Sequence, residues 1–184
     1  MIKFVFILLY NFLRWGWIKM LHGNRYQGHP VQRISMRCAL KIFDQSSLNI
    51  GKNCELAYGC CIEAHGQGVL QIGDHVYMNR YCMLSCQNAI SIGSGCIFGP
   101  GVKVFDNNHQ FSAEEGVSQK LNTAPINIGK NCWIASDVVI LKGVTIGDNC
   151  LIGAGCIISD DVPSGMMVKQ DKHLTMTPIR KRTQ

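Results

Sequence analysis

The sequence lacks the signals of several common protein classes. Its ten cysteines include no CxxC pair, so their spacing does not by itself indicate a metal or dithiol centre. The longest unbroken apolar run near the N-terminus covers residues 4–10, too short to cross a bilayer of about 30 Å as a helix. No small-residue cleavage site follows it, so we do not expect a secretory signal. With 184 residues, we expect one domain with appendages.

Acidic residues are absent from positions 1–43, which contain seven Lys and Arg residues. A second basic segment covers residues 169–184, whereas residues 44–168 are acidic overall. The net charge of +6 is therefore confined to the two ends. This distribution predicts a local anionic partner, such as a membrane surface or a phosphate, and no nucleic-acid groove along the body.

Residues 1–21 have the pattern of an amphipathic helix. At about 100° per residue, Lys3, Asn11 and Arg14 fall on one narrow face, opposite a wide apolar face that carries Trp and Phe. Such a helix can lie in a membrane interface. It can equally pack over the open end of a repeat domain, and the pattern does not choose between these arrangements.

An apolar residue recurs every six positions through most of the chain. All fifteen positions of this pattern are apolar in a chain that is 47% apolar, which random order would give about once in 10⁵ tries. The period predicts stacked coils. The fifteen positions are Ile50, Leu56, Ile62, Ile72, Met78, Leu84, Ile92, Phe98, Val104, Ile128, Ile134, Ile140, Ile146, Ile152 and Ile158.

Neighbouring columns follow the same period. Glycine often comes directly after the apolar position, as expected at a tight corner. Four positions after it stands a column of Val and Cys, which holds seven of the ten cysteines. Buried free Cys behaves as a small hydrophobe, so this column needs neither disulfides nor metal. It also predicts a reducing compartment, and we expect the protein in the cytoplasm.

Three hexapeptides form a coil of 18 residues with one strand on each face of a triangular prism. Coils that begin at residues 50, 72, 92, 128 and 146 leave an insertion of eighteen residues after Val104. We therefore expect an all-β parallel β-helix of about five to six coils, with a long loop extruded at about 105–124. The expected segments are an N-terminal helix and linker at 1–30, the β-helix at 31–168 and a basic tail at 169–184.

Four segments resemble the hexapeptide-repeat acyltransferases, and within them the sugar and polysaccharide O-acetyltransferase group. These segments are 104–111, 128–134, 143–147 and 152–155. The resemblance implies a left-handed β-helix, an exception to the usual right-handed crossover. It also implies transfer of acetyl from acetyl-CoA to a hydroxyl of a sugar or surface polysaccharide precursor, in a homotrimer with active sites between subunits.

His109 lies in the long insertion, where similar enzymes carry the histidine that takes the proton from the acceptor hydroxyl. An alcohol is a poor nucleophile until its proton is being removed, and imidazole titrates near neutral pH. Asp106 could orient the ring, although main-chain carbonyls of a tight loop could do so equally well.

The resemblance also predicts where the two substrates bind. Asn79, one position after an apolar column residue, corresponds to an acceptor-binding Asn in similar enzymes. Similar proteins bind the pantetheine arm and adenine of the donor along one edge of the prism, and Lys142 is a candidate for the phosphates by its charge. The residues expected along that edge are Trp133, Ala135, Ser136, Ala154 and Ser159.

Other functions on the same scaffold remain alternatives. A γ-type carbonic anhydrase would need three His ligands, two of them five residues apart, but position 114 is Glu, so we expect no metal. An N-acetyltransferase of an amino sugar, an antibiotic acetyltransferase and a noncatalytic scaffold subunit stay open. The basic, Trp-rich N-terminus indicates an acceptor at the inner face of a membrane, which residues 1–21 would contact.

Overall fold

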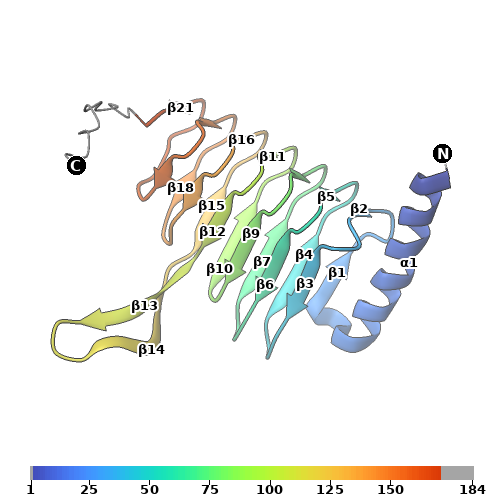
Figure 1. Cartoon of the computed structure of the whole chain (residues 1–184), viewed down its shortest axis with the longest axis horizontal. Coiled ribbons are helices and arrows are strands. Elements are labelled where there is room, and N and C mark those ends of the chain that lie inside the picture. Colours follow the sequence, from blue (N-terminus) through green and yellow to red (C-terminus); the bar gives the residue numbers. More distant parts are fainter. Residues whose placement is uncertain (1, 171–184) are drawn as a thin grey trace, which may run out of the picture.

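The computed structural model describes residues 2–170, with side chains from residue 5 onward. Of the expected basic tail, residues 171–184 lie outside this range. The chain winds into six coils, each giving one strand to each of three parallel sheets, and one further strand extends the second sheet (Figure 1). The expected parallel β-helix is confirmed.

The strands are short, and successive coils pair them in parallel. Sheet A contains β1 (Tyr26–Gly28), β4 (Ser47–Ile50), β7 (Val69–Ile72), β10 (Ala89–Ile92), β15 (Ile126–Ile128) and β18 (Thr145–Ile146). Sheet B contains β2 (Arg33–Ile34), β5 (Glu55–Leu56), β8 (Tyr77–Met78), β11 (Ile97–Phe98), β16 (Trp133–Ile134), β19 (Leu151–Ile152) and β21 (Met167–Val168). Sheet C contains β3 (Ala39–Ile42), β6 (Cys61–Ala64), β9 (Met83–Cys86), β12 (Lys103–Phe105), β17 (Val139–Ile140) and β20 (Ile157–Ile158).

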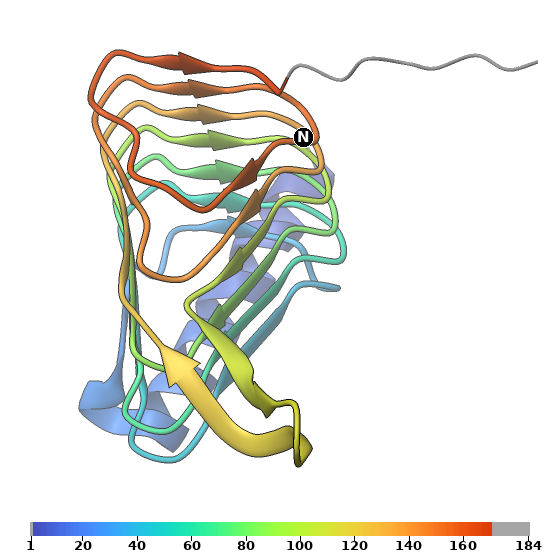
Figure 2. The same cartoon turned by 90° about the vertical axis from the view of Figure 1, so that its left-hand side faces the viewer.

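The solenoid has the left-handed sense. In Figure 2 the C-terminal coils lie nearest the viewer and the strands along the top run to the right, so the chain turns clockwise as it approaches. The register follows the six-residue period, because Ile50 pairs with Ile72, Ile72 with Ile92, and Ile92 with Ile128. β1 begins at Tyr26, inside the segment expected to be linker, so the coils start earlier than predicted.

The interior is a continuous stack of apolar side chains. All fifteen column positions are buried, as are the seven cysteines of the neighbouring column. Several buried thiols donate to a carbonyl of the next coil, for example Cys96 Sγ to Gly129 O at 3.0 Å and Cys132 Sγ to Gly147 O at 3.1 Å. All ten cysteines are free. The six-residue pattern therefore marks the core, and the thiols pack there as small apolar groups.

Two corners of the prism matter for function. The B–C corner comprises the residues that follow the strands of sheet B, namely 35–38, 57–60, 79–82, 99–102, 135–138 and 153–156. The C–A corner comprises those that follow the strands of sheet C, namely 43–46, 65–68, 87–88, 106–125, 141–144 and 159–161. Sheet C separates the two corners within one chain.

Helix α1 (Ile2–His22) covers the first coil and is followed by a short 3-10 turn, η1 (Gly23–Arg25) (Figure 1). The exposed edge of a sheet leaves main-chain groups unpaired. Polar side chains of α1 bind these groups: Asn11 Nδ2 donates to Ile34 O at 2.9 Å, and Arg14 donates to Cys38 O at 2.6 Å. Trp15 Nε1 donates to Gly28 O at 2.6 Å. The helix therefore caps the β-helix.

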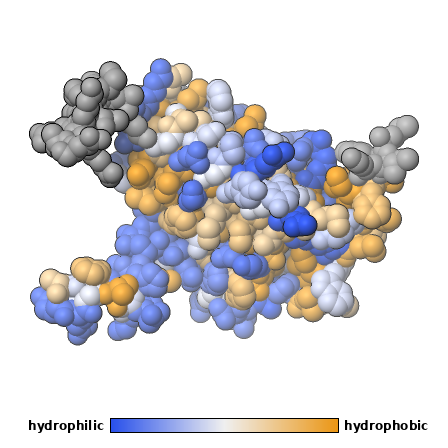
Figure 3. Space-filling model, viewed as in Figure 1, coloured by the Kyte–Doolittle hydropathy of each residue, from blue (hydrophilic) through white to orange (hydrophobic). Residues whose placement is uncertain are grey.

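In this arrangement the polar face of α1 is turned toward the protein and its apolar face toward the outside. The polar face expected at Asn11 and Arg14 points into the protein, and Asn11 is only 4% exposed. The outward face is apolar, and hydrophobic side chains gather at this end of the molecule (Figure 3). The exposed apolar residues of α1 are Val5, Phe6, Leu9, Phe12, Leu13, Trp17, Met20 and Leu21. Within residues 2–170, no helix combines the length and apolar character that crossing a bilayer requires.

Candidate functional site

A β-hairpin leaves the C–A corner of the fourth coil, where the sequence predicted an extruded loop. It consists of β13 (Asn107–Ser112) and β14 (Gly116–Thr123), paired antiparallel, and it projects away from the prism (Figure 1). Ala124 N donates to Asp106 O at 2.9 Å, which closes the base of the hairpin. The insertion is therefore an ordered arm held at a fixed point of the solenoid.

The carboxylate of Asp106 fixes that base. Its side chain is fully buried and accepts hydrogen bonds from Gln87 N at 2.8 Å and Asn88 N at 2.8 Å, both in the corner of the preceding coil. Asn107 Nδ2 also donates to it at 3.0 Å. A carboxylate that accepts several N–H groups satisfies its charge inside the protein. Asp106 thus anchors the point where the hairpin leaves the coil.

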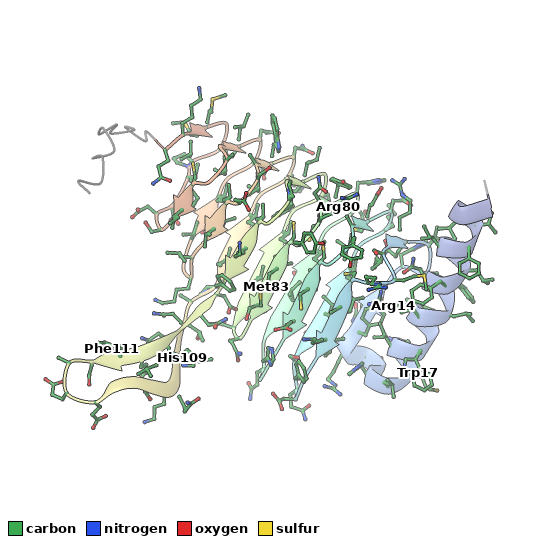
Figure 4. All side chains as sticks on the ribbon, in the orientation of Figure 1. Arg14, Trp17, Arg80, Met83, His109 and Phe111 are labelled. Carbon is green, nitrogen blue, oxygen red and sulfur yellow. The ribbon has the colours of Figure 1, made fainter. Side chains whose placement is uncertain are left out.

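His109 stands on the hairpin near its base, with an exposed ring (Figure 4). Its Nδ1 lies 2.9 Å from Ser118 O on the opposite strand. A carbonyl oxygen can only accept, so Nδ1 carries the hydrogen in the neutral ring and Nε2 has the free lone pair. This is the tautomer that a general base facing outward requires.

The sequence left two possible partners for the ring of His109, the side chain of Asp106 or a main-chain carbonyl. The expectation that Asp106 orients the imidazole is wrong in this geometry, because its carboxylate is buried in the turn of the preceding coil. The main-chain carbonyl of Ser118 holds the ring instead. Ser118 itself was not predicted, since a contact between residues nine positions apart depends on the hairpin register.

Asn79 is the first residue of the B–C corner in the third coil and is half-buried. Its Oδ1 accepts a hydrogen bond from Arg80 N at 2.8 Å, which fixes the amide plane and leaves Nδ2 as a donor. Among the described residues, no side chain or carbonyl accepts from Nδ2. A primary amide held this way can donate to a hydroxyl oxygen of a bound molecule.

The residues expected to bind the acyl donor fall into two groups. Ala135 and Ser136 lie at the B–C corner of the fifth coil, and Ala154 lies one coil further along the same corner. Trp133, at the start of the preceding strand, is 54% exposed beside the exposed Ile97 of the adjacent coil. Ala135, Ser136 and Ala154 form a strip of small corner residues next to the exposed ring of Trp133, on the same corner of the prism as Asn79.

Ser159 and Lys142 do not share that edge. Both lie at the C–A corner, so the expectation that Ser159 lines the same edge as Ala154 is wrong. Ser159 comes five positions after Ala154, and one hexapeptide step carries the chain to the next corner. Ser159 Oγ donates to Asp160 Oδ2 at 2.8 Å.

His109 and Asn79 are far apart within one chain. They occupy the C–A and B–C corners, on opposite margins of sheet C, and Figure 4 shows Met83 of that sheet between His109 and Arg80, the residue after Asn79. The catalytic histidine and the acceptor residue expected from the sequence therefore do not meet in a single chain.

The remaining reactive side chains do not form a competing site. Burial raises the pKa of Cys86 and of Cys96 to about 12, which keeps both thiols protonated and unreactive. The half-exposed Cys61 also has its pKa raised to about 11, by desolvation and then by the neighbouring Glu63. Within residues 2–170, no group of three or more His, Cys, Asp or Glu side chains could hold a metal ion.

Comparison with known proteins points to transferases with the same repeat. A family model described as bacterial transferase hexapeptide (six repeats) matches residues 125–160. The galactoside O-acetyltransferase of Escherichia coli K12 is 36% identical over 98 residues, which are 53% of this chain and 48% of that protein. The chain thus spans about half the length of this relative.

Two further similar proteins broaden the comparison. An Escherichia coli K12 protein, provisionally named the lipopolysaccharide biosynthesis O-acetyl transferase WbbJ, is 25% identical over 136 residues, 69% of each chain. The crystal structure of AntD, an N-acyltransferase from Bacillus cereus in complex with dTDP and 3-hydroxybutyryl-CoA, has a TM-score of 0.67 at 17% identity and covers 83% of this chain and 81% of that one. The AntD likeness shows a shared fold.

Proposed function

We propose that this chain belongs to the hexapeptide-repeat transferases, whose model matches residues 125–160, and that it is an O-acetyltransferase that moves acetyl from acetyl-CoA to a hydroxyl of a saccharide. The observation that carries the proposal is the ring of His109, held by Ser118 O with Nε2 free on an arm that projects from the fourth coil. The relatives named as galactoside and lipopolysaccharide O-acetyl transferases support a sugar acceptor.

In the proposed reaction His109 Nε2 takes the proton of the acceptor hydroxyl while the oxygen attacks the thioester carbonyl carbon. A C–O bond forms and the C–S bond breaks. The sulfur leaves with the electron pair of that bond and receives a proton, so the products are an acetyl ester and CoA. Asn79 Nδ2 is the proposed donor to another oxygen of the acceptor, which orients the attacking hydroxyl.

The strip formed by Ala135, Ser136 and Ala154 is the proposed seat of the pantetheine arm, with the exposed ring of Trp133 beside it. Small side chains at a corner leave main-chain groups accessible to a long, flexible thioester. Lys142 and Ser159 lie at the C–A corner, which also carries His109. If a site is shared between two copies of the chain, we therefore assign these two residues to the copy that supplies the histidine.

The separation of the two corners favours an assembly in which copies complete each other's sites. We propose a homotrimer in which the hairpin of one chain reaches the B–C corner of its neighbour, bringing His109 of one copy to Asn79 of the next. Closed cyclic symmetry then repeats the same contact three times.

Acetyl transfer to a panel of acceptors tests the proposed function. We expect CoA release from acetyl-CoA in the presence of galactosides or other hydroxyl-bearing sugars, measured by thiol titration and by mass spectrometry of the product. An N-acetyltransferase, the alternative that the sequence leaves open, would instead use amino sugars. If none of the acceptors in the two panels led to release of CoA, both assignments would be contradicted.

We also propose that the outward face of α1 contacts a membrane, and that the protein works in the cytoplasm at the inner membrane surface. The helix directs Asn11 and Arg14 inward and leaves eight large apolar side chains exposed, which a lipid interface would accept. Basic residues without acids in positions 1–43 favour an anionic lipid surface. The ten free cysteines are consistent with a reducing compartment.

Replacing Phe6, Phe12 and Trp17 together with serine should weaken binding to vesicles of phosphatidylglycerol and phosphatidylcholine by roughly 100-fold, because each side chain loses about 1 kcal/mol of burial. Co-sedimentation measures the effect, and a thermal melt checks that α1 still caps the coils. As a matched control, Phe111→Ser with Val117→Ser removes exposed apolar groups from the hairpin tip and should leave vesicle binding unchanged. Equal binding by the triple variant and the wild type would contradict the proposal.

A further inference from the structure

The B–C corner holds a tyrosine where the backbone favours glycine. The third position of this corner has positive φ in five coils, occupied by Gly59, Tyr81, Gly101, Asp137 and Gly155. Tyr81 has φ of 61°, a conformation that side chains with a Cβ rarely adopt, least of all bulky ones. Residues with strained backbone of this kind are enriched at binding sites, where the position of the side chain serves the function.

The ring of Tyr81 packs against Tyr58 and Gly59 of the preceding coil. A Cβ at Gly59 would lie 2.5 Å from Tyr81 Cδ1. The ring of Tyr81 therefore occupies space that any side chain at position 59 would need. Tyr58, the residue before that glycine, meets the ring edge-on, with centroids 5.6 Å apart and planes at 82°. The two rings nevertheless remain accessible, because Tyr58 is 44% and Tyr81 is 60% exposed.

Two arginines flank these rings. Arg37 lies one coil before Tyr58, with its guanidinium 6.0 Å from the centre of that ring. Arg80 lines a cavity of about 340 Å³ together with Tyr58 and Tyr81. Within residues 2–170 neither arginine has a carboxylate partner, whereas Arg33 on sheet B is paired with Glu55 at 2.7 Å. The cavity therefore combines apolar ring surface with unneutralised positive charge.

This cluster adjoins the proposed acceptor residue. Asn79 bonds to the backbone N–H of Arg80, so the amide and the aromatic cavity share one corner turn. From Asn79 the cluster extends toward α1, away from the strip at Ala135 and Ala154. A molecule bound at Asn79 for acetylation can therefore continue into the cavity without crossing the proposed donor strip.

We propose that Arg37, Tyr58, Arg80 and Tyr81 form a second acceptor subsite, which binds a neighbouring sugar residue that carries a carboxylate or a phosphate. The apolar C–H face of a sugar ring packs on aromatic surface, and guanidinium groups bind either anion through paired N–H donors. This inference rests on the proposed function, since it extends the acceptor from one sugar to an anionic oligosaccharide.

Binding is tested without acetyl-CoA, by calorimetry with three disaccharides: lactose, a glucuronic-acid disaccharide and trehalose 6-phosphate. We expect at least one anionic probe to bind about 10-fold more tightly than lactose, and the preferred probe identifies carboxylate or phosphate as the natural anion. Tyr81→Gly and Arg80→Gln should each raise the Kd for that probe by about 10-fold. Lys52→Gln, which removes an exposed cation at another corner, should leave the Kd unchanged.

The design separates a binding role from a structural one. Glycine suits the positive φ at position 81, so Tyr81→Gly should keep a melting temperature and an oligomeric state close to those of the wild type. Dissociation of the oligomer or a large fall in melting temperature would make the ring a structural contact and overturn the inference, as would an unchanged Kd. Acetyl transfer by the wild-type protein, measured separately, reports on the proposed function alone.

Discussion

Replacing His109 with alanine should lower kcat for acetyl transfer by about 10²–10⁴-fold, the usual contribution of a positioned general base. The hydroxyl oxygen of the acceptor then attacks the thioester with its proton still attached. Acetyl-CoA binds along a different corner strip in the proposed site, so its Kd should change little. Steady-state kinetics with a saccharide acceptor and equilibrium binding of CoA measure the two effects separately.

Glutamine at position 109 sharpens this experiment. Its amide can donate to Ser118 O as the imidazole does, which preserves the cross-strand contact, but it cannot take a proton. His109→Gln should therefore be as slow as His109→Ala. His75→Asn, in an exposed corner with φ of 58°, keeps a residue suited to that backbone and should retain full activity. Substantial activity in either His109 variant would exclude a general-base role for this histidine.

Periodicity predicted the scaffold because burial in a β-helix repeats with the coil. Ile50, Ile72 and Ile92 pair in register since each occupies the same face of successive coils, and Cys96 and Cys132 are buried for the same reason. The hairpin was also predictable, because an insertion cannot enter a filled core and has to leave at a corner.

The hydrogen-bond partners of the side chains in and beside the hairpin were harder to predict than the scaffold. Asp106 continues the alternation of the buried Val102 and Val104, so its inward direction could have been read from the sequence. Its partners could not, because they are the main-chain N–H groups of Gln87 and Asn88 in another coil. The partner of His109 likewise depends on the register of β13 and β14.

The orientation of α1 exposes a second limit of pattern reading. A helical wheel groups Asn11 with Arg14 but does not say whether that face meets water or protein. Here the first coil presents free carbonyls, such as Ile34 O and Cys38 O, which amide and guanidinium donors bind. The requirement to pair the main-chain groups of a sheet edge decided the orientation. Such a requirement becomes visible only when the helix and coil are placed together.

Two inactive variants should restore activity in one another if the sites lie between copies. Co-expressing His109→Ala with Asn79→Ala under two affinity tags and purifying through both tags isolates mixed assemblies. In a cyclic trimer with two kinds of subunit, one of the three interfaces pairs an intact His109 with an intact Asn79. The mixed trimer should therefore show about one third of the wild-type activity, whereas each variant alone stays nearly inactive.

The recovered fraction also reports the assembly, since a two-fold dimer with shared sites would recover about one half. As the control, the His109→Ala chain is co-expressed under both tags, and no activity should return, because no copy then supplies an imidazole. The physical basis is the placement of the two residues: the hairpin leaves the C–A corner, Asn79 stands at the B–C corner, and sheet C lies between them. A mixed assembly as inactive as its parents would place both residues' functions within one chain, and the arm would need another role.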